Sequence, residues 1–399
     1  MRVKKEWGIF AVLVLALRTL YAAVGALILR SGGPAPLGGP TYPLMLPYLH
    51  TDWFSRWFIN PWYQWDTASY LEISIFGYKA HSSAIAFMPF YPMLMRFLAP
   101  LVAQDHLAAA LLISSGCTLA TLILLYELLL YTYDAKLALR TVLAFLVFPT
   151  TFFMLAGYTE SLFLTLVLGF WILARKQRWG WAAFLASLAT LTRLQGIVLT
   201  PVLIWLVLSS RVPDLDKNPL KQIKQVLGNV AWTKSPRIYW TLLLSAGPVL
   251  VAAGYQLWLK VSGFGSIDTT LSQYWKIETV APWTGFYLFI QRLFTLKFIY
   301  MDWIDLCLFI LIVLISVFSL RDLPLDFSNY IWLTLAILFM RGTPPHLLAS
   351  FSRYFLALFP IFILPAKMES KSIRIFALSA SMCLQVLLAW VFLLGSWVA

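Results

Sequence analysis

Long apolar stretches, separated by short polar or basic segments, recur along the whole chain. A helix that crosses a bilayer needs about 20 mostly apolar residues, and a helix pairs its backbone groups internally, as hydrocarbon requires. The pattern predicts an all-α integral membrane protein, folded as a single transmembrane domain over 1–399. About eleven spans are expected, with ten to thirteen compatible, near 8–29, 107–130, 141–156, 160–174, 180–192, 196–210, 238–259, 301–320, 327–340, 353–366 and 374–397.

The four spans between 141 and 210 are shorter than a full bilayer crossing. The turns that join them are GYTE at 157–160, RKQR at 175–178 and TRLQG at 192–196. Short helices of this kind do not suit isolated lipid-spanning rods. They are expected to line a polar cavity that dips into the bilayer.

The distribution of basic residues predicts an orientation. The first apolar run follows a basic start and is interpreted as an uncleaved first span. If the amino terminus is cytoplasmic, most lysines and arginines fall in inner segments, as the positive-inside rule requires. The inner loop 211–237 contains LKQIKQVLGNV, which predicts a basic amphipathic helix on the anionic cytoplasmic leaflet.

Two outer segments are too long to be simple connections. The first, 31–106, begins with a Gly- and Pro-rich loop and continues with DWFSRWFINPWYQWD. The second, 260–300, contains Tyr274, Trp275 and Lys276. Aromatic residues mixed with charges are typical of helices that lie in the membrane interface, in contact with lipid headgroups.

Composition strengthens the membrane assignment and changes the meaning of the charge. Of 399 residues, 61% are apolar and 12% are charged, against roughly 25% charged in soluble domains. The formal charge of +13 would favour nucleic acid in a soluble protein, but here it lies in interhelical loops, so no nucleic-acid partner is expected. The three cysteines stand in apolar runs without metal-ligand spacing.

Two acids on the expected outer face are the candidates for catalysis. Asp66, in QWDTASYLE, follows the aromatic segment and could act as a general base toward a hydroxyl group. Helix N-capping is the alternative, with about even weight. Glu160, in AGYTESLFL, begins a short span and could equally complement a helix dipole. A carboxylate at membrane depth nevertheless usually faces a partner or a cavity.

Basic residues next to the same outer turns are candidates for binding phosphate. They are Arg96 in FYPMLMR, Arg193 in LTRLQG and Arg353 in FSRYF, with His346 nearby. The planar guanidinium matches phosphate oxygens. Any one of them could instead extend to lipid headgroups, and a single interfacial histidine is more often a surface residue.

Several absences restrict the donor. The one Asp-x-Asp pair, Asp214 and Asp216, lies in the expected inner loop 211–237, and the chain contains no Cys/His cluster and no Walker-type glycine-rich loop. With the acids outside, a nucleotide-sugar or ATP is not the expected direct donor, and neither a cofactor nor a metal is expected. A lipid-phosphate carrier of a sugar is the consistent choice.

The motifs WDTASYLEISIFGY, FMPFYP, FFMLAGYTESLF, LTRLQG and FSRYFLALFPIF follow one another between about 60 and 365. In this order they resemble the PIG-V family of GPI mannosyltransferase 2-like proteins, within the GT-C class of membrane glycosyltransferases. The chain differs from the family pattern after Asp66 and at Leu194 and Gln195. The resemblance implies a GT-C fold with a long first outer loop, a polyprenyl- or dolichyl-phosphate mannose donor and inverting transfer.

The motifs of the family map onto most of the candidate site residues. Asp66 and Glu160 are the expected catalytic pair, and Arg193 and Arg353 are the expected phosphate ligands, joined by Arg96 and His346 from their position alone. Substrate contacts are expected from the remaining motif side chains: Trp65, Tyr91, Tyr158, Ser161 and Tyr354. The acceptor, a lipid or a glycan, stays open, as does the oligomeric state. A lipid or solute transporter and a catalytically inactive scaffold are the alternatives from other classes.

Overall fold

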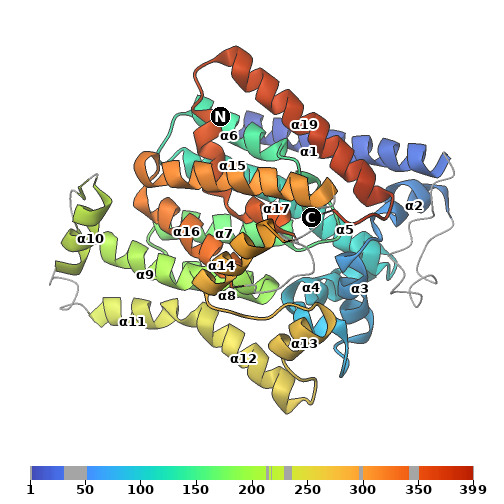
Figure 1. The fold of residues 1–399 in the computed structure, drawn as a ribbon, viewed down its shortest axis with the longest axis horizontal. Coiled ribbons are helices and arrows are strands. Elements are labelled where there is room, and N and C mark those ends of the chain that lie inside the picture. The colour runs from blue at the N-terminus through green and yellow to red at the C-terminus, as the bar shows by residue number, and fades with distance from the viewer. Residues whose placement is uncertain are drawn as a thin grey trace.

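The computed structural model describes residues 2–30, 52–212, 215–216, 218–228, 236–295, 300–340 and 350–398. Across these ranges the regular elements are helices, with no β-strand among them, which confirms the all-α prediction (Figure 1). The α-helices are α1 (Arg2–Arg30), α2 (Trp53–Phe58), α3 (Asp66–Phe76), α4 (Phe90–Leu98), α5 (His106–Leu129), α6 (Ala135–Leu146), α7 (Glu160–Arg175), α8 (Trp179–Thr192), α9 (Leu199–Ser209), α10 (Pro219–Gly228), α11 (Pro236–Ser245), α12 (Gly247–Val261), α13 (Ile267–Tyr274), α14 (Pro282–Leu293), α15 (Tyr300–Asp322), α16 (Leu325–Leu338), α17 (Phe351–Tyr354), α18 (Ile363–Ala366) and α19 (Lys371–Leu393).

Four of the described helices are long and apolar enough to cross a membrane. These four helices are Lys5–Ile28, His106–Leu129, Asp302–Asp322 and Lys371–Leu393. A fifth span results if α11 and α12, which meet at a bend of 40°, are counted together. The chain is therefore a multi-pass membrane protein, and the number of eleven spans stays a prediction.

Most predicted spans coincide with single helices. The predicted span 238–259 is divided between α11 and α12, and two more, 141–156 and 353–366, are not continuous helices. After α6 the chain continues irregularly into a short 3-10 helix, η5 (Thr151–Met154). The second segment is divided into short helical turns from α17 to α18. Proline explains both interruptions, because it lacks an N–H group and clashes with the preceding turn: Pro149 lies in the first and Pro360 in the second.

The segment 31–106, predicted to be the first outer loop, carries helices where it is described. α2, α3 and α4 all fall between 52 and 106. α13 and α14 lie within the segment 260–300, and α10 forms within the basic segment 211–237. α1 and α19 pack side by side along one edge of the molecule, opposite α11 and α12 (Figure 1).

An apolar core joins the two ends of the chain. It includes Phe10 of α1, Phe170 of α7 and Phe392 of α19. The irregular segment after α6 is buried in this core, where an unpaired backbone carbonyl would be costly. Side chains supply the missing partners: Thr118 donates to the Met154 carbonyl at 2.6 Å, and Gln385 donates to the Phe148 carbonyl at 2.8 Å. This segment leads directly to the GYTE turn.

Candidate functional site

The two predicted catalytic acids lie at the amino-terminal ends of two different helices. Asp66 is the first residue of α3 and Glu160 is the first residue of α7. Their exposed fractions are 8% and 4%. The positive end of a helix dipole stabilises a carboxylate in the first turn. The N-cap position of α3 is Trp65, and the Asp66 side chain instead bonds to a distant arginine.

Arg353 joins the two acids. Its Nη1 atom donates to Asp66 Oδ2 at 2.7 Å, and its Nε atom forms an ion pair with Glu160 Oε1 at 3.2 Å. α17 carries Arg353 and begins after Ser350, whose φ of 67° is unusual for a residue other than glycine. Non-glycine residues in this region cost free energy and concentrate at functional sites. The bridge therefore rests on a strained backbone.

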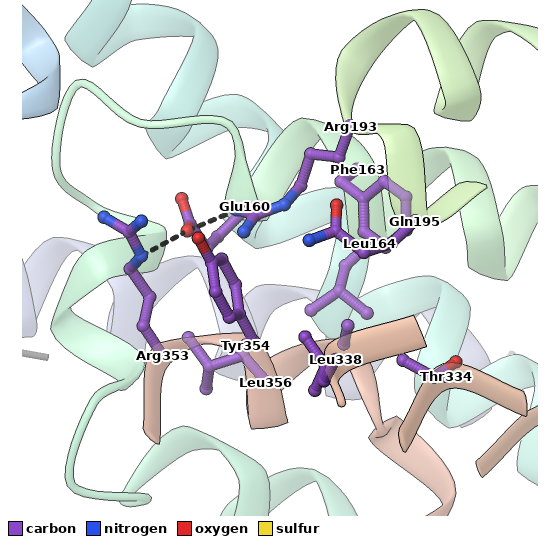
Figure 2. A pocket seen from close by; sticks show the side chains of 11 residues that line it. Glu160, Phe163, Leu164, Arg193, Gln195, Thr334, Leu338, Arg353, Tyr354 and Leu356 are labelled. Atoms are coloured by element: carbon purple, nitrogen blue, oxygen red, sulfur yellow. Dashed lines mark hydrogen bonds and ion pairs between the residues drawn. The ribbon is translucent and has the colours of Figure 1, made fainter. Parts of the chain in front are cut away.

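Arg193 completes the cluster from the end of α8. It pairs with Glu160 Oε1 and donates to Thr159 Oγ1 at 3.2 Å. Figure 2 shows Glu160 between the two guanidinium groups. Two carboxylates and two guanidinium groups give a formally neutral set. Sharing two arginines offsets the cost of burying the carboxylates.

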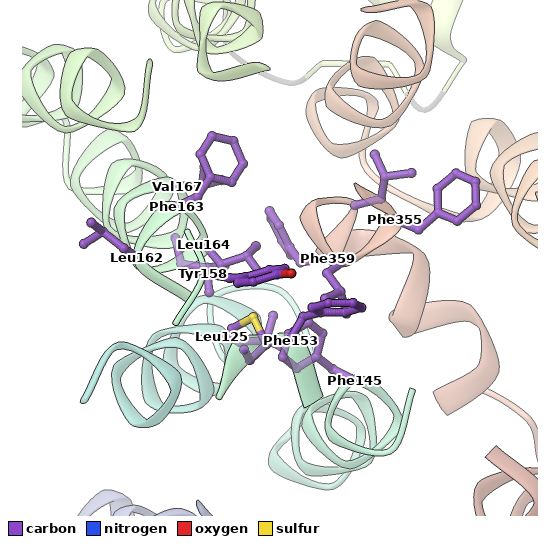
Figure 3. Close-up of a cluster of buried hydrophobic side chains, with 14 of the residues drawn as sticks. Leu125, Phe145, Phe153, Tyr158, Leu162, Phe163, Leu164, Val167, Phe355 and Phe359 are labelled. Atoms are coloured by element: carbon purple, nitrogen blue, oxygen red, sulfur yellow. The ribbon is translucent and has the colours of Figure 1, made fainter. Parts of the chain in front are cut away.

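Aromatic rings form one wall of the ionic cluster. The Arg353 guanidinium carbon lies 5.2 Å from the Tyr158 ring centroid and 5.5 Å from that of Phe153. These two rings stack with centroids 5.2 Å apart, within the apolar cluster shown in Figure 3. The Tyr158 hydroxyl also accepts a bond from the Asp66 backbone N–H at 3.3 Å. Tyr158 thus orients both Arg353 and the start of α3.

Tyr70 extends the polar network on the α3 side. Its hydroxyl lies 3.3 Å from Thr159 Oγ1, the atom that Arg193 also contacts. Burial, followed by the negative charges of Asp66 and Glu160, raises the pKa of the Tyr70 hydroxyl well above its ordinary value. The hydroxyl therefore stays protonated at neutral pH and can act as a hydrogen-bond donor.

A cavity of about 580 Å³ opens beside this cluster, within the ordinary size range of small-molecule sites. Asp66, Arg193 and Arg353 line one part of it, and Phe87 and Trp275 line another. Glu160 lines a much smaller buried space next to it, shown in Figure 2. The arrangement provides a carboxylate, guanidinium groups and aromatic faces around one space.

Trp65 and the carboxyl-terminal segment close one side of the cavity. The Trp65 Nε1 atom donates to the Ser396 carbonyl at 3.2 Å, and its ring meets the Trp397 ring edge-on at 5.2 Å. Both tryptophans line the cavity. Trp65 has a φ of 47°, so Asp66 follows a second strained residue.

The other predicted site residues lie apart from this cluster or outside the described residues. Arg96 donates to the Ser74, Ile75 and Ile73 carbonyls at 2.6, 3.1 and 3.4 Å, and so caps the end of α3. The Tyr91 hydroxyl is buried against Ala110 and Ser114 of α5.

Ser161 and Tyr354 flank the acids more closely. Ser161 follows Glu160 and is fully buried, whereas Tyr354 lines the cavity, with its ring centroid 4.9 Å from the Arg193 guanidinium carbon. His346 lies outside the described residues. The structure therefore brings together Asp66, Glu160, Arg193 and Arg353, with Trp65, Tyr158 and Tyr354 around them, but not Arg96 or Tyr91.

Sequence reasoning missed Trp397 and Tyr70, and it gave Lys276 no chemical role. All three line the cavity. Tyr70 lies one helical turn after Asp66, and this spacing is a signal that could have identified it. Trp397 follows a long apolar helix and carried no comparable signal. Its position depends on how α19 packs.

The match to a known family decides the membership of the chain. The family described as Mannosyltransferase (PIG-V) matches residues 9–232, which is more than half of the sequence. The chain belongs to the PIG-V mannosyltransferase family. The matched region includes three of the four charged residues of the cluster, Asp66, Glu160 and Arg193. Arg353 lies beyond it, so the membership itself does not cover the bridging arginine.

One curated relative of the PIG-V chain is GPI mannosyltransferase 2 of Schizosaccharomyces pombe. The two are 32% identical over 149 residues, which is 36% of this chain and 31% of the relative. The matched segment thus spans about a third of the relative's length.

Two solved structures of the Archaeoglobus fulgidus oligosaccharyltransferase are also similar to the chain. The form tethered to an acceptor peptide containing the NVT sequon gives a TM-score of 0.44 at 11% identity, and the apo form gives 0.42 at 13% identity. Each covers 96% of this chain, which spans 55% and 56% of those chains, respectively. These scores carry no argument about the site, which rests on the geometry described above.

Proposed function

We propose that this protein is an inverting membrane glycosyltransferase of GT-C type. It moves a hexose, most consistently mannose, from a polyprenyl- or dolichyl-phosphate carrier to a hydroxyl group of a lipid or glycan acceptor. The observation that carries the proposal is the position of Asp66. It is a carboxylate held at a helix amino terminus by Arg353 on the wall of a cavity large enough for a substrate.

The chemistry assigned to Asp66 is general-base catalysis. The acceptor oxygen attacks the anomeric carbon of the sugar and passes its proton to Asp66, while the bond from that carbon to the carrier phosphate breaks. The phosphate leaves with the bonding electron pair. Arg353 donates to Oδ2 of Asp66. The other carboxylate oxygen, Oδ1, is then available to receive the proton.

The remaining charged groups have supporting roles. Glu160 holds Arg193 and Arg353 in place through its two ion pairs. Both arginines line the same cavity as Asp66, and their free N–H groups can donate to oxygen atoms of the departing phosphate. Trp65, Tyr158 and Tyr354 support or line this space and orient the substrates.

The orientation of α7 supports an extracytoplasmic site. Glu160 begins the helix and Arg175 ends it after 16 residues, a rise of about 24 Å. Arg175, Lys176 and Arg178 follow at the far end. Basic residues at helix ends favour the cytoplasmic side. The acid cluster then belongs to the outer face, with the amino terminus inside.

A direct assay tests the proposal. Purified protein in sealed proteoliposomes is incubated with radiolabelled mannosyl-phosphoryl dolichol and a membrane lipid extract that serves as the acceptor pool. We expect label to move to a new lipid or glycan product, with one dolichyl phosphate released per sugar transferred. Label that only crosses the bilayer on unchanged donor indicates a transporter, and label that remains wholly on the donor indicates an inactive scaffold; either result contradicts the proposal.

A further inference from the structure

The charged groups around Asp66 neutralise one another. Arg353 is engaged by Asp66 and Glu160, and Arg193 is engaged by Glu160. Two negative and two positive charges therefore leave no excess positive charge at the acid end of the cavity. A lipid phosphate that leaves with additional negative charge requires stabilisation by a positive group in a site that excludes water. The two arginines can donate hydrogen bonds to this phosphate, but a positive charge that no carboxylate neutralises has to come from elsewhere on the cavity wall.

Among the described residues that line the cavity, the remaining cation is Lys276. It follows α13 in the segment Tyr274–Trp275–Lys276–Ile277, which contributes four consecutive side chains to the wall. Its Nζ atom donates to the Gln273 carbonyl at 3.0 Å, and none of the described carboxylates forms an ion pair with it. An ammonium group has three N–H donors, so two remain for a ligand.

The backbone at Lys276 is a second, independent observation. Its φ is 53°, in the left-handed region that glycine occupies at lowest cost after a helix. The next N–H, that of Ile277, returns to the Leu271 carbonyl at 3.0 Å and holds the turn. A lysine in place of glycine costs free energy here. An observed outlier of this kind supports a functional role.

Next to Lys276, Trp275 adds a further donor to the same wall. Its ring meets Phe87 edge-on at 5.9 Å, and its Nε1–H group is buried with no acceptor among the described residues. A buried donor without a partner is costly unless something satisfies it. An anionic or hydroxyl-rich ligand in the cavity supplies such an acceptor.

We infer that Lys276 is the residue that neutralises the phosphate of the lipid-linked donor, at the wall of the cavity formed by the segment after α13. The inference rests on the proposed function, because it assigns the donor's phosphate to a specific side chain. Asp66 and Lys276 then divide the reaction: Asp66 serves the acceptor hydroxyl, and Lys276 serves the leaving phosphate. Arg193 and Arg353 hold the two acids. Because the carboxylates already neutralise their charges, they contribute hydrogen bonds to the phosphate but no excess positive charge.

Binding of farnesyl phosphate and of farnesol tests this inference without sugar transfer. The two probes share a polyprenyl chain and differ in the phosphate. Their dissociation constants are measured by microscale thermophoresis for the wild-type protein, Lys276→Met and Lys276→Arg in the same detergent. Methionine keeps an unbranched stem and removes the charge, whereas arginine keeps the charge.

We expect the wild-type protein to bind farnesyl phosphate at least tenfold more tightly than farnesol. A hydrogen bond to a charged group stabilises by about 1.5–3 kcal/mol, and each 1.4 kcal/mol changes the dissociation constant about tenfold. Lys276→Met should lose most of this preference and retain farnesol binding, and Lys276→Arg should restore it. Lys260→Met, on the exposed face of α12 and away from the cavity lining, is the matched control and should resemble the wild type.

Two results overturn the inference. One is an unchanged preference in Lys276→Met, and the other is equal affinity of the wild-type protein for both probes. An unchanged preference in Lys276→Met leaves the transferase proposal standing, because the phosphate is then bound by another residue, whereas equal affinity of the wild-type protein also counts against a lipid-phosphate donor. Conversely, a negative mannose-transfer assay with a lost phosphate preference in Lys276→Met contradicts the proposed function and not the phosphate site.

Discussion

The guanidinium group of Arg353 lies 2.7 Å from the carboxylate of Asp66, although 287 positions separate the two residues in the chain. The same guanidinium group reaches Glu160 at the start of a third segment. Three parts of the chain therefore meet at one arginine. This contact links the stability of the site to its proposed chemistry, and the predictions below separate the two.

Asp66→Asn should reduce sugar transfer by about 10²–10⁴-fold, because the amide cannot accept the proton of the acceptor hydroxyl. The variant keeps the size of the side chain and an oxygen for Arg353, so the protein should remain folded. The measurement is kcat for mannose transfer, with thermal unfolding as a check on folding. Glu72→Gln, a partly buried acid on the same helix, is the control and should keep its activity. Transfer by Asp66→Asn at the wild-type rate would remove Asp66 from the mechanism.

Arg353→Gln should destabilise the protein strongly. It leaves the carboxylates of Asp66 and Glu160 without their shared partner, and breaking a buried ion pair from one side costs about 3–5 kcal/mol. The measurement is the midpoint of thermal unfolding in detergent, which should fall by several degrees.

The double variant Asp66→Asn/Arg353→Gln provides the control for that prediction. It removes the charge of Asp66, which Arg353→Gln leaves without an ion-pair partner while Glu160 keeps Arg193, and it should recover part of the lost stability, which appears as a coupling in a double-mutant cycle. Strictly additive losses, or an Arg353→Gln protein as stable as the wild type, would show that the ion pairs do not hold the segments together.

Gly157→Ala should disturb the site through packing. An added Cβ atom would lie 2.9 Å from Cγ2 of Thr67, and a threonine on α3 has little freedom to move away. The GYTE turn must then shift from α3, and Tyr158 with it. We expect a destabilisation of about 1–3 kcal/mol and a loss of transfer activity. Both are measured on the purified variant.

Gly116→Ala is the matched control for that substitution. Gly116 lies in α5, and an added Cβ atom there meets nothing within 4 Å. Alanine favours helix over glycine by about 1 kcal/mol, so this variant should be as stable as the wild type or more so. Equal effects of the two substitutions would contradict the packing argument.

Trp397→Ala should weaken substrate binding more than folding. Trp397 lines the cavity, where its ring can pack against a bound substrate, and an aromatic contact is worth about 0.5–1.5 kcal/mol. We expect KM for the lipid-linked donor or the acceptor to rise by about 2–13-fold. Trp240→Ala, at an exposed position on α11, should leave KM unchanged. A wild-type KM in Trp397→Ala would show that this ring does not contact substrate.

The membrane character and most helices were predictable from the sequence because they depend on local properties. Each long apolar stretch requires lipid or other helices around it, whatever the rest of the chain does. The helices near 8–29, 160–174 and 301–320 were therefore found at nearly their observed bounds. The predicted spans 141–156 and 353–366, which are not continuous helices, contain prolines, and a count of apolar residues does not register how proline interrupts a helix inside a packed core.

The candidate site depended on the tertiary structure to a greater extent. The sequence identified Asp66, Glu160, Arg193 and Arg353 as chemically notable, because charged residues next to apolar runs are costly and rarely incidental. It could not indicate that the arginines bind the acids, since ion pairs between distant segments form only when helices pack. The same packing turned Arg96 toward the end of α3 and brought Trp397 to Trp65. The hydrophobic pattern is a property of consecutive residues and can be found in the sequence, whereas the neighbours of a buried charge depend on how the whole chain folds.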